Sequence, residues 1–455
     1  MRDVAGSVGQ SHSSEEVSVM GMERRALVIQ SDYFKQPAAA GMMREEMTKS
    51  LPVSKQMVYE SYLTVVSKDG CAGIDRQSID MFNDNLSGNL YKVWNRMTSG
   101  SYFPPPVRSV LISKKQGGFR PLGIPTVSDR IAQGVVKNFL EPRMEEVFHN
   151  SSFGYRPGRS AHDALNQCVS NCTMFPWVID VDIKGFFDNI SHEIMLRLLE
   201  QHTPDKWVLM YVERWLKAGV EQEDKSILAR EKGTPQGGVI SPLLSNIYLH
   251  HCFDKWMDEQ CAHKPFERYA DDMVIHCCSK KEAEGILEKL KARMMEFELT
   301  LHPEKTKIVY CKDYRRKESH DNESFTFLSY SFEPRCTGGK DKSKQRLVFS
   351  PAISQMAKVH IRTKIGEVLY HRRSVQTLQR TAEKLNPKIR GWINYYTRYR
   401  RDKAYGVFLY LNILIRKWIK TTYKIRSNAK AYKAYMEIWK ASPQLFYHWK
   451  LGIIY

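Results

Sequence analysis

The sequence predicts an α+β fold, with a mixed N-terminal part and a helical C-terminal part. Short runs rich in β-branched and aromatic residues, bounded by turn residues, indicate strands at 107–112, 177–183 and 266–276. Between these runs, apolar residues recur every three to four positions, which is typical of amphipathic helices. Beyond about residue 338 the helical spacing dominates, so we expect helices in that region.

Helical spacing begins near Leu51 and continues to about Gly100, and Pro104-Pro105-Pro106 then prevents its continuation. We expect Gln116-Gly117-Gly118 to form a hairpin turn after the first strand. Ser128 is expected to cap a helix that begins at Asp129, and Ser241 to cap a helix whose first position is Pro242. Further helices are expected at 191–201, 205–218, 241–258 and 280–298.

Charge is distributed very unevenly along the chain. The 455 residues carry a net charge of +19, and 42% of them are apolar, which is ample for a packed core. From Lys340 to Tyr455 there are 26 Lys and Arg against 5 Asp and Glu, whereas the residues before them are nearly neutral. A basic block that is also rich in Tyr and Trp favours a nucleic-acid partner over a solvated helical face.

This charge boundary suggests three segments. Residues 1–48 form a weakly patterned N-terminal segment that we expect to be partly disordered. Residues 49–338 contain the expected strands, and residues 339–455 form the basic helical part. No apolar run reaches the roughly eighteen residues needed to cross a bilayer, so we expect no membrane partner and a cytoplasmic protein.

The cysteines indicate a reducing compartment. There are nine, and none forms a Cys-x-x-Cys pair. Cys168 and Cys172 are four apart, and Cys277 and Cys278 are adjacent. Neither spacing is typical of a zinc site or a disulfide framework, so we expect buried thiols.

Two acidic segments carry the first indication of chemistry. Tyr269-Ala270-Asp271-Asp272 lies between short apolar runs and is expected at a hairpin tip. Two adjacent carboxylates repel each other and, as hard oxygen ligands, suit magnesium. The same tetrapeptide read alone is an equally good ordinary turn.

The strand expected at 177–183 supplies further carboxylates. Alternation places Asp180 and Asp182 on the same face as Val178. Carboxylates on an otherwise buried strand are costly unless they are paired or bind a metal. Together with Asp271 they fit a two-metal site for phosphoryl transfer, although a satisfied surface carboxylate is the better interpretation of Asp180. Phe187 follows Asp182 by five residues and could pack beneath a nucleotide sugar, excluding a 2′-hydroxyl.

Three loops carry residues suited to a nucleotide. The glycine-rich segment 233–242 permits close approach of a substrate, and Gln236 offers both a donor and an acceptor. Lys114 and Arg120 flank the expected hairpin turn and could contact a triphosphate. Lys305 could give a proton to departing pyrophosphate. Each of these segments taken alone is also compatible with an ordinary surface turn.

In this order, the motifs resemble those of group II intron-encoded reverse transcriptases/maturases. The similarity covers about residues 55–455. The matching stretches are Arg120-Pro121-Leu122-Gly123-Ile124-Pro125, Asp129-Arg130-Ile131-Ala132-Gln133, Phe153-Gly154-Tyr155-Arg156-Pro157-Gly158-Arg159-Ser160, Val181-Asp182-Ile183-Lys184-Gly185-Phe186-Phe187-Asp188, Thr234-Pro235-Gln236-Gly237-Gly238, Tyr269-Ala270-Asp271-Asp272, Pro303-Glu304-Lys305-Thr306-Lys307 and Arg390-Gly391-Trp392-Ile393-Asn394-Tyr395-Tyr396.

The resemblance implies a right-hand polymerase. Residues 49–338 would be fingers and palm with an N-terminal extension, and residues 339–455 an α-helical thumb/maturase domain. It assigns metal binding, with two Mg²⁺ ions or Mn²⁺ as a substitute, to Asp182, Asp271 and Asp272. It makes Lys305 the candidate proton donor.

The same resemblance implies the nucleotide contacts and the partners. Phe187 becomes the sugar-gating aromatic, Gln236 lies beside the incoming nucleotide, and Lys114 and Arg120 contact its triphosphate. The expected activity is RNA-directed DNA polymerisation from dNTPs. The expected partners are group II intron RNA or another RNA template and a DNA or RNA primer, in a bacterial cytosol or nucleoid.

One departure from the family pattern and two alternatives accompany this interpretation. Many members continue into an endonuclease with clustered Cys and His, which this sequence lacks, so it resembles an endonuclease-lacking form. Priming is then expected from another nick or a nascent strand. The alternatives are a domesticated enzyme of DNA repair or phage defence, and a protein that acts mainly as an RNA-binding splicing cofactor.

Overall fold

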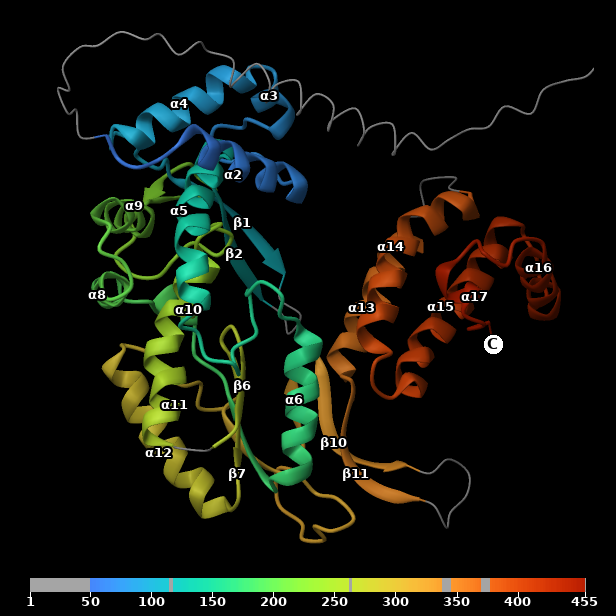
Figure 1. The fold of residues 1–455 in the computed structure, drawn as a ribbon. Coiled ribbons are helices and arrows are strands. Elements are labelled where there is room, and N and C mark those ends of the chain that lie inside the picture. The colour runs from blue at the N-terminus through green and yellow to red at the C-terminus, as the bar shows by residue number, and fades with distance from the viewer. Residues whose placement is uncertain (1–49, 114–117, 262–263, 338–344, 370–376, 455) are drawn as a thin grey trace, which may run out of the picture.

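The computed structural model describes residues 50–113, 118–261, 264–337, 345–369 and 377–454. The expected N-terminal segment, Lys114 and most of the expected turn at 116–118 lie outside these residues. Figure 1 shows an α+β arrangement: helices and a small sheet at the top, a central sheet with flanking helices below, and a group of helices to one side. The predicted fold class is confirmed.

The N-terminal region combines helices with a four-stranded sheet of order β2-β1-β4-β5, in which β1 and β2 are antiparallel. The helix after this hairpin begins at Val127, because Thr126 and not Ser128 caps it: the Thr126 hydroxyl accepts a hydrogen bond from the amide of Asp129 at 3.1 Å. The elements are α2 (Lys55–Lys68), α3 (Ile79–Asn83), α4 (Leu86–Thr98), β1 (Val107–Ser113), β2 (Phe119–Ile124), α5 (Val127–Glu145), α8 (His192–Glu200), α9 (Lys206–Lys217), β4 (Val220–Glu221) and β5 (Ile227–Leu228).

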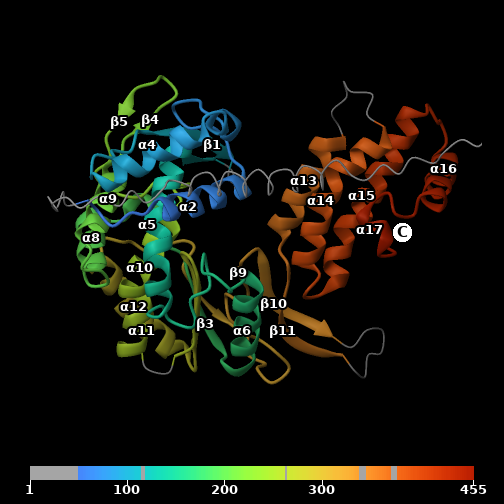
Figure 2. The same ribbon diagram turned by 45° about the horizontal axis from the view of Figure 1, so that its top comes forward.

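The central sheet is antiparallel and has the order β6-β7-β3-β8. Its strands are β3 (Trp177–Val181), β6 (Phe266–Tyr269), β7 (Asp272–Cys277) and β8 (Lys307–Tyr310). Alternation along β3 divides its residues between two hydrophobic cores. Ile179 and Val181 pack in the core shared with α12 (Lys280–Glu296), whereas Val178 packs in the core shared with α6 (Ala161–Met174). Figures 1 and 2 show these helices on opposite faces of the sheet.

The helix expected at 241–258 is interrupted in its middle by a π-helix. α10 (Ser241–Leu249) runs into a π-helix (His250–Asp254) and then into α11 (Lys255–Gln260). Ser241 is the first helical residue and not the cap, since its hydroxyl donates to the carbonyl oxygen of Pro235 at 2.9 Å. Single π-turns inside α-helices are frequent at functional sites, and this one carries Asp254, which contacts the central sheet as described below.

The expectation of helices alone beyond residue 338 is wrong. β11 (Arg346–Ile353) pairs with β10 (Tyr330–Thr337) along eight residues, and β9 (Phe325–Phe327) completes a sheet of order β11-β10-β9. The strand was missed because its Pro351 and Ser350 interrupt the apolar pattern. The expected boundary at 338/339 therefore falls between two paired strands, and the helical part begins at α13.

Among the described residues after β11 there are five helices, and they lie to one side of the central sheet (Figures 1 and 2). They are α13 (Gln355–Leu369), α14 (Leu378–Tyr396), α15 (Arg401–Thr422), α16 (Asn428–Ala441) and α17 (Tyr447–Lys450). They share a core with α6 and with the α6-facing side of the central sheet. Among the helices in the described part of the chain, none is both long enough and apolar enough to cross a lipid bilayer.

Candidate active site

The carboxylates predicted at the hairpin tip lie at one end of the central sheet. Tyr269 pairs with Asp272, so Ala270 and Asp271 form the two-residue connection between β6 and β7. Ala270 adopts the left-handed conformation with φ of 56°, which a tight connection requires and which is unusual for a residue with a Cβ. Val181 of β3 pairs with Met273 of β7, and Asp182 therefore follows β3 at the same end of the sheet.

Asp182 and Asp272 line one cavity of about 460 Å³. Asp180 and Lys305 line the same cavity, and the Lys305 ammonium lies 3.3 Å from Oδ2 of Asp182. The structure thus brings two of the three predicted metal ligands together with the predicted proton donor in this cavity, and the charges of Asp182 and Lys305 also act on the third, Asp271. It also places Asp180, whose side chain shares a strand face with Asp182, on this cavity.

The carboxylates in this cluster disfavour one another's ionised forms. Burial raises the pKa of Asp271, to which the charge of Asp182 also contributes. Burial, followed by the charges of Asp271 and Asp182, raises the pKa of Asp272 to about 7. Asp180 is affected similarly, because burial and then the charges of Asp272 and Asp182 raise its pKa to about 8. Such values mark a site where negative charge is held in excess.

This donor set fits a divalent cation of the hard class. Its members are carboxylate oxygens, and such ions take oxygen ligands. The positive charges of Arg120 and Lys305 oppose the negative charges of Asp271 and Asp272. A bound cation would relieve the mutual repulsion, since the charge of the ion inverts the local preference for protonated carboxyls.

The predicted nucleotide residues lie in two places. The pKa values of Asp271 and Asp272 are raised overall by burial, and the positive charge of Arg120, on β2, partly offsets this rise. Arg120 therefore faces the carboxylate end of the sheet. Phe187 and Gln236 line a second cavity of about 500 Å³ that has no lining residue in common with the carboxylate cavity. Phe187 lies in α7 (Phe186–Asn189), and its carbonyl oxygen accepts a hydrogen bond from the amide of Thr234 at 2.8 Å. Lys114 is outside the described residues.

A buried arginine that the sequence did not single out supports the hairpin tip. Arg268 is fully buried, and its guanidinium binds both carboxylate oxygens of Asp254 at 2.7 and 2.6 Å. Its Nη1 donates to the carbonyl oxygen of Ala270 at 3.3 Å and to Oδ1 of Asn246 at 2.9 Å. Burial alone would raise the pKa of Asp254, but the guanidinium holds that pKa below its ordinary value. The π-helix and α10 thus hold the strand that ends at the carboxylates.

The segment around Gly154 packs directly against the same tip. A Cβ on Gly154 would lie 2.3 Å from the backbone nitrogen of Ala270, so only glycine fits there. The Gly154 carbonyl oxygen accepts a hydrogen bond from Asn246 at 2.8 Å. The next residue, Tyr155, has its ring 6.4 Å from that of Tyr269, and burial followed by the charge of Asp271 raises its pKa. This motif therefore forms part of the wall beside the carboxylates.

A second buried network holds the Gln236 loop. Asp129 accepts hydrogen bonds from Tyr102, Trp215 and Gln133 at 3.0, 2.8 and 2.9 Å. Oε1 of Gln133 in turn accepts the amide of Val239 at 2.7 Å. Burial raises the pKa of Asp129 to about 6. Asp129 and Gln133 lie in one of the segments that match the family motifs. The sequence alone did not indicate that they hold the Gln236 loop.

Comparison with known proteins gives two family matches. Residues 112–332 match the family described as reverse transcriptase (RNA-dependent DNA polymerase). Residues 359–436 match the family described as group II intron, maturase-specific domain. The first match spans the central sheet with its carboxylates, and the second spans the helices from α13 to α16.

Curated relatives agree with these matches. Protein YkfC of Escherichia coli is 32% identical over 296 residues, which cover 57% of this chain and 74% of that protein. Group II intron-encoded protein LtrA of Lactococcus lactis is 33% identical over 262 residues, which cover 57% of this chain and 42% of LtrA. A 91 kDa protein in a cob intron of Schizosaccharomyces pombe is 36% identical over 180 residues, 39% of this chain and 21% of that protein.

Among solved structures, telomerase from Candida albicans in complex with a telomeric RNA fragment aligns with 79% of this chain and 68% of that chain. The TM-score is 0.43 at 10% sequence identity, below the level at which a shared fold would follow. The family matches and the YkfC relationship are the stronger findings. The chain belongs to the group II intron reverse transcriptase/maturase family of RNA-directed DNA polymerases.

Proposed function

We propose that the protein extends a DNA or RNA primer on an RNA template at the cavity lined by Asp182 and Asp272. The observation that carries this proposal is the convergence of three mutually repelling carboxylates, Asp182, Asp271 and Asp272, at one end of an antiparallel sheet. These three residues would hold two Mg²⁺ ions, or Mn²⁺ in their place. When bound, the ions would activate the primer 3′-hydroxyl and neutralise charge on the transferring phosphate.

The chain's own residues position the reacting groups. The hairpin tip, held by Arg268 and Gly154, fixes Asp271 and Asp272 relative to Asp182. Arg120 and Lys114 are proposed to bind the triphosphate, with the planar Arg120 guanidinium suited to two phosphate oxygens. Lys305, at 3.3 Å from Asp182, is proposed to give a proton to the departing pyrophosphate. Positioning and electrostatic stabilisation of this kind supply most of the catalysis in phosphoryl transfer.

Phe187 and Gln236 are proposed to bind the sugar and base of the incoming nucleotide. Both line the second cavity, and the ring of Phe187 packs edge-on against Phe186 at a centroid distance of 5.3 Å. A ring braced in this way resists displacement by a 2′-hydroxyl. Gln236 is carried by the loop that Gln133 holds.

Phe187→Ala is expected to admit ribonucleotides, because the methyl side chain leaves space beside the sugar. We expect the ratio of kcat/KM for dNTP over rNTP to fall by about 10- to 100-fold, which corresponds to a modest steric penalty. Single-nucleotide primer extension on an RNA template measures both substrates. Phe103→Ala is the matched control, since Phe103 is an exposed aromatic outside both cavities. Unchanged exclusion of rNTPs would remove the gating role from Phe187.

The C-terminal helices are proposed to bind group II intron RNA and assist its splicing and mobility. We propose residues 49–338 as fingers and palm and residues 339–455 as the thumb/maturase part, although β11 of the latter pairs with β10 of the former. The support is a basic hollow of about 250 Å³ between α15 and α16, lined by Arg416, Lys417 and Lys420. Closely spaced cations of this kind suit the phosphate backbone of RNA.

The triple substitution Arg416→Gln, Lys417→Gln and Lys420→Gln is expected to weaken intron RNA binding and to reduce the salt dependence of affinity. Losing three phosphate contacts would flatten the slope of log K against log [salt] by roughly 2. Filter binding of the RNA that flanks the reading frame measures this slope, and splicing of that RNA at low magnesium measures function. Lys280→Gln, Lys289→Gln and Lys291→Gln on α12 remove the same charge elsewhere. Equal loss in both triple variants would contradict a specific site on α15.

A further inference from the structure

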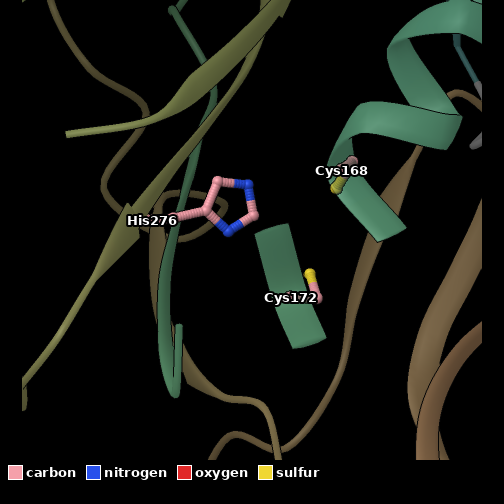
Figure 3. Close-up of side chains that lie close together, drawn as sticks. All are labelled: Cys168, Cys172 and His276. Carbon is pink, nitrogen blue, oxygen red and sulfur yellow. The ribbon is translucent and has the colours of Figure 1, made fainter. Parts of the chain in front are cut away.

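A cluster of thiols and one imidazole lies inside the molecule, away from the carboxylate cavity. Cys168 and Cys172 lie on the same face of α6, one turn apart, and His276 lies on β7. One ligand atom from each of the three lies within 4.8 Å of the others. Figure 3 shows the two side chains of α6 and the ring of His276 directed into one space. All three residues are buried, with exposed fractions of 0, 1 and 0%.

A third thiol adjoins this group. Cys311 follows β8 directly, is buried, and forms a side-chain interaction with Cys172. The backbone holds the two cysteines together, because Nη1 of Arg316 donates to the carbonyl oxygens of both Cys172 and Cys311, at 2.8 and 3.0 Å. The amide of Cys311 also donates to the carbonyl oxygen of Pro176, at 2.8 Å. Backbone contacts therefore hold Cys311 beside Cys172, although its sulfur lies outside the group formed by Cys168, Cys172 and His276.

The imidazole is oriented as a metal ligand would be. Nε2 of His276 lies 2.7 Å from Oε2 of Glu267, and Oε1 of Glu267 accepts a hydrogen bond from Asn171 at 2.5 Å. Nδ1 of the same ring is buried and makes no hydrogen bond of ordinary geometry, and the ring interacts with the side chain of Cys172. Histidines that bind metal commonly give their other ring N–H to a carboxylate that is itself hydrogen-bonded. The arrangement around His276 has both features. Burial alone would lower the pKa of His276, but the Glu267 charge and the contact with Cys172 raise it to about 10, so Nδ1 would bind an ion after losing its proton.

We propose that Cys168, Cys172, Cys311 and His276 form a structural zinc site between α6 and the central sheet. Three sulfur ligands and one nitrogen ligand are a common set for structural zinc, which is tetrahedral. At the usual Zn–S and Zn–N lengths, neighbouring ligand atoms lie about 3.5–3.8 Å apart. The ligand atoms of Cys168, Cys172 and His276 lie within 4.8 Å of one another, so they would have to draw slightly closer around an ion, and the Cys311 sulfur, which lies outside that group, would have to move in as the fourth ligand. The ion would join α6, β7 and the end of β8, and its site goes beyond the polymerase function and does not depend on it.

The raised pKa values of the buried thiols determine how zinc must be supplied when the site is tested. Burial raises the pKa of Cys168 and of Cys172 to about 12, so zinc must displace their protons. Because metal binding at such sites is coupled to folding, zinc should be present while the chain folds. The full chain, without a polyhistidine tag, is therefore produced in zinc-supplemented medium and dialysed against excess Mg²⁺, which competes for the carboxylate cavity.

We expect close to one zinc ion per chain by elemental mass spectrometry. A zinc-selective chelator should lower the midpoint of thermal unfolding by about 5 °C or more, because the ion stabilises only the folded state. Refolding the wild-type chain with Co²⁺ should produce the absorption bands of tetrahedral thiolate coordination. Both wild-type measurements avoid the risk that a substituted chain fails to fold.

Variants then assign the ligands. Cys172→Ser and Cys168→Ser are expected to lose the zinc, whereas Cys252→Ser, at another fully buried cysteine, should keep it. Asp271→Asn should also keep it, because the carboxylate cavity is separate: Asp272 and His276 are four residues apart on β7, about 13 Å along the strand. Wild-type protein with less than about a tenth of an equivalent of zinc would overturn the proposal. So would zinc that persists in Cys172→Ser or disappears in Asp271→Asn.

Discussion

Replacing Asp271 with asparagine is expected to abolish primer extension while leaving RNA binding intact. The carboxylate would be lost from the proposed metal site, and such sites supply several kcal/mol of transition-state stabilisation. The rate should therefore fall by about 10³-fold or more. Extension of a labelled primer on an RNA template, at saturating Mg²⁺, measures the loss. Equilibrium binding of the same template should be unchanged, because the proposed RNA contacts Arg416, Lys417 and Lys420 line a hollow that shares no residue with the carboxylate cavity.

The same substitution should not weaken the fold. The pKa of Asp271 is raised above its ordinary value, so its ionised form destabilises the metal-free folded state at neutral pH. Asparagine removes that charge, and the midpoint of thermal unfolding without divalent ions should stay equal or rise. Asp321→Asn, at an exposed carboxylate, is the control and should leave extension unchanged. Extension by Asp271→Asn at near wild-type rate would refute the assignment of the carboxylates.

The second large effect is expected at Arg268, which acts as a positioning residue. Arg268→Met removes the partner of the fully buried Asp254, and an uncompensated buried charge costs about 3–5 kcal/mol of folding stability. It also removes the hydrogen bonds to Ala270 and Asn246, so the hairpin tip loses its support. A displacement of about 1 Å at a reacting centre can cost 10²-fold in rate. We expect a loss of that size in kcat, measured on the folded fraction.

A double variant separates folding from positioning. In Arg268→Met with Asp254→Leu no buried charge is left unpaired, so most of the unfolding free energy should return. Primer extension should nevertheless remain low, because nothing replaces the hydrogen bond to Ala270. Arg335→Lys alters a buried arginine in the β10 strand and is the matched control. If the double variant recovered full activity, Arg268 would be a stability residue alone.

Residues of the candidate site could be predicted from the sequence where their placement depends on a local pattern, such as strand alternation or a short turn. Alternation along the strand predicts that Asp180 and Asp182 share one face, and both side chains line the carboxylate cavity. The hairpin at Ala270 and Asp271 likewise follows from two short apolar runs separated by a turn. The roles of these residues remain proposals.

Other features depend on contacts between distant segments. Arg268 lies in a strand between Glu267 and Tyr269, where a charged residue in the sequence is typical of an exposed position. Only the fold places it against the π-helix and Asp254. The predicted cap of α5, Ser128, lies two residues after the observed cap, Thr126. Both residue types suit an N-cap, and the backbone geometry selects Thr126.

The sequence by itself determined the α+β class, the order of the polymerase motifs and the concentration of positive charge in the last quarter of the chain. These properties are encoded in local periodicity, residue type and composition. The tertiary structure alone decided which side chains meet, including the pairing of β11 with β10 across the expected boundary. It also brought Cys168 and Cys172 to His276, a site that their spacing argued against. Ligand sets of this kind arise from long-range packing, which cysteine spacing within one helix does not record.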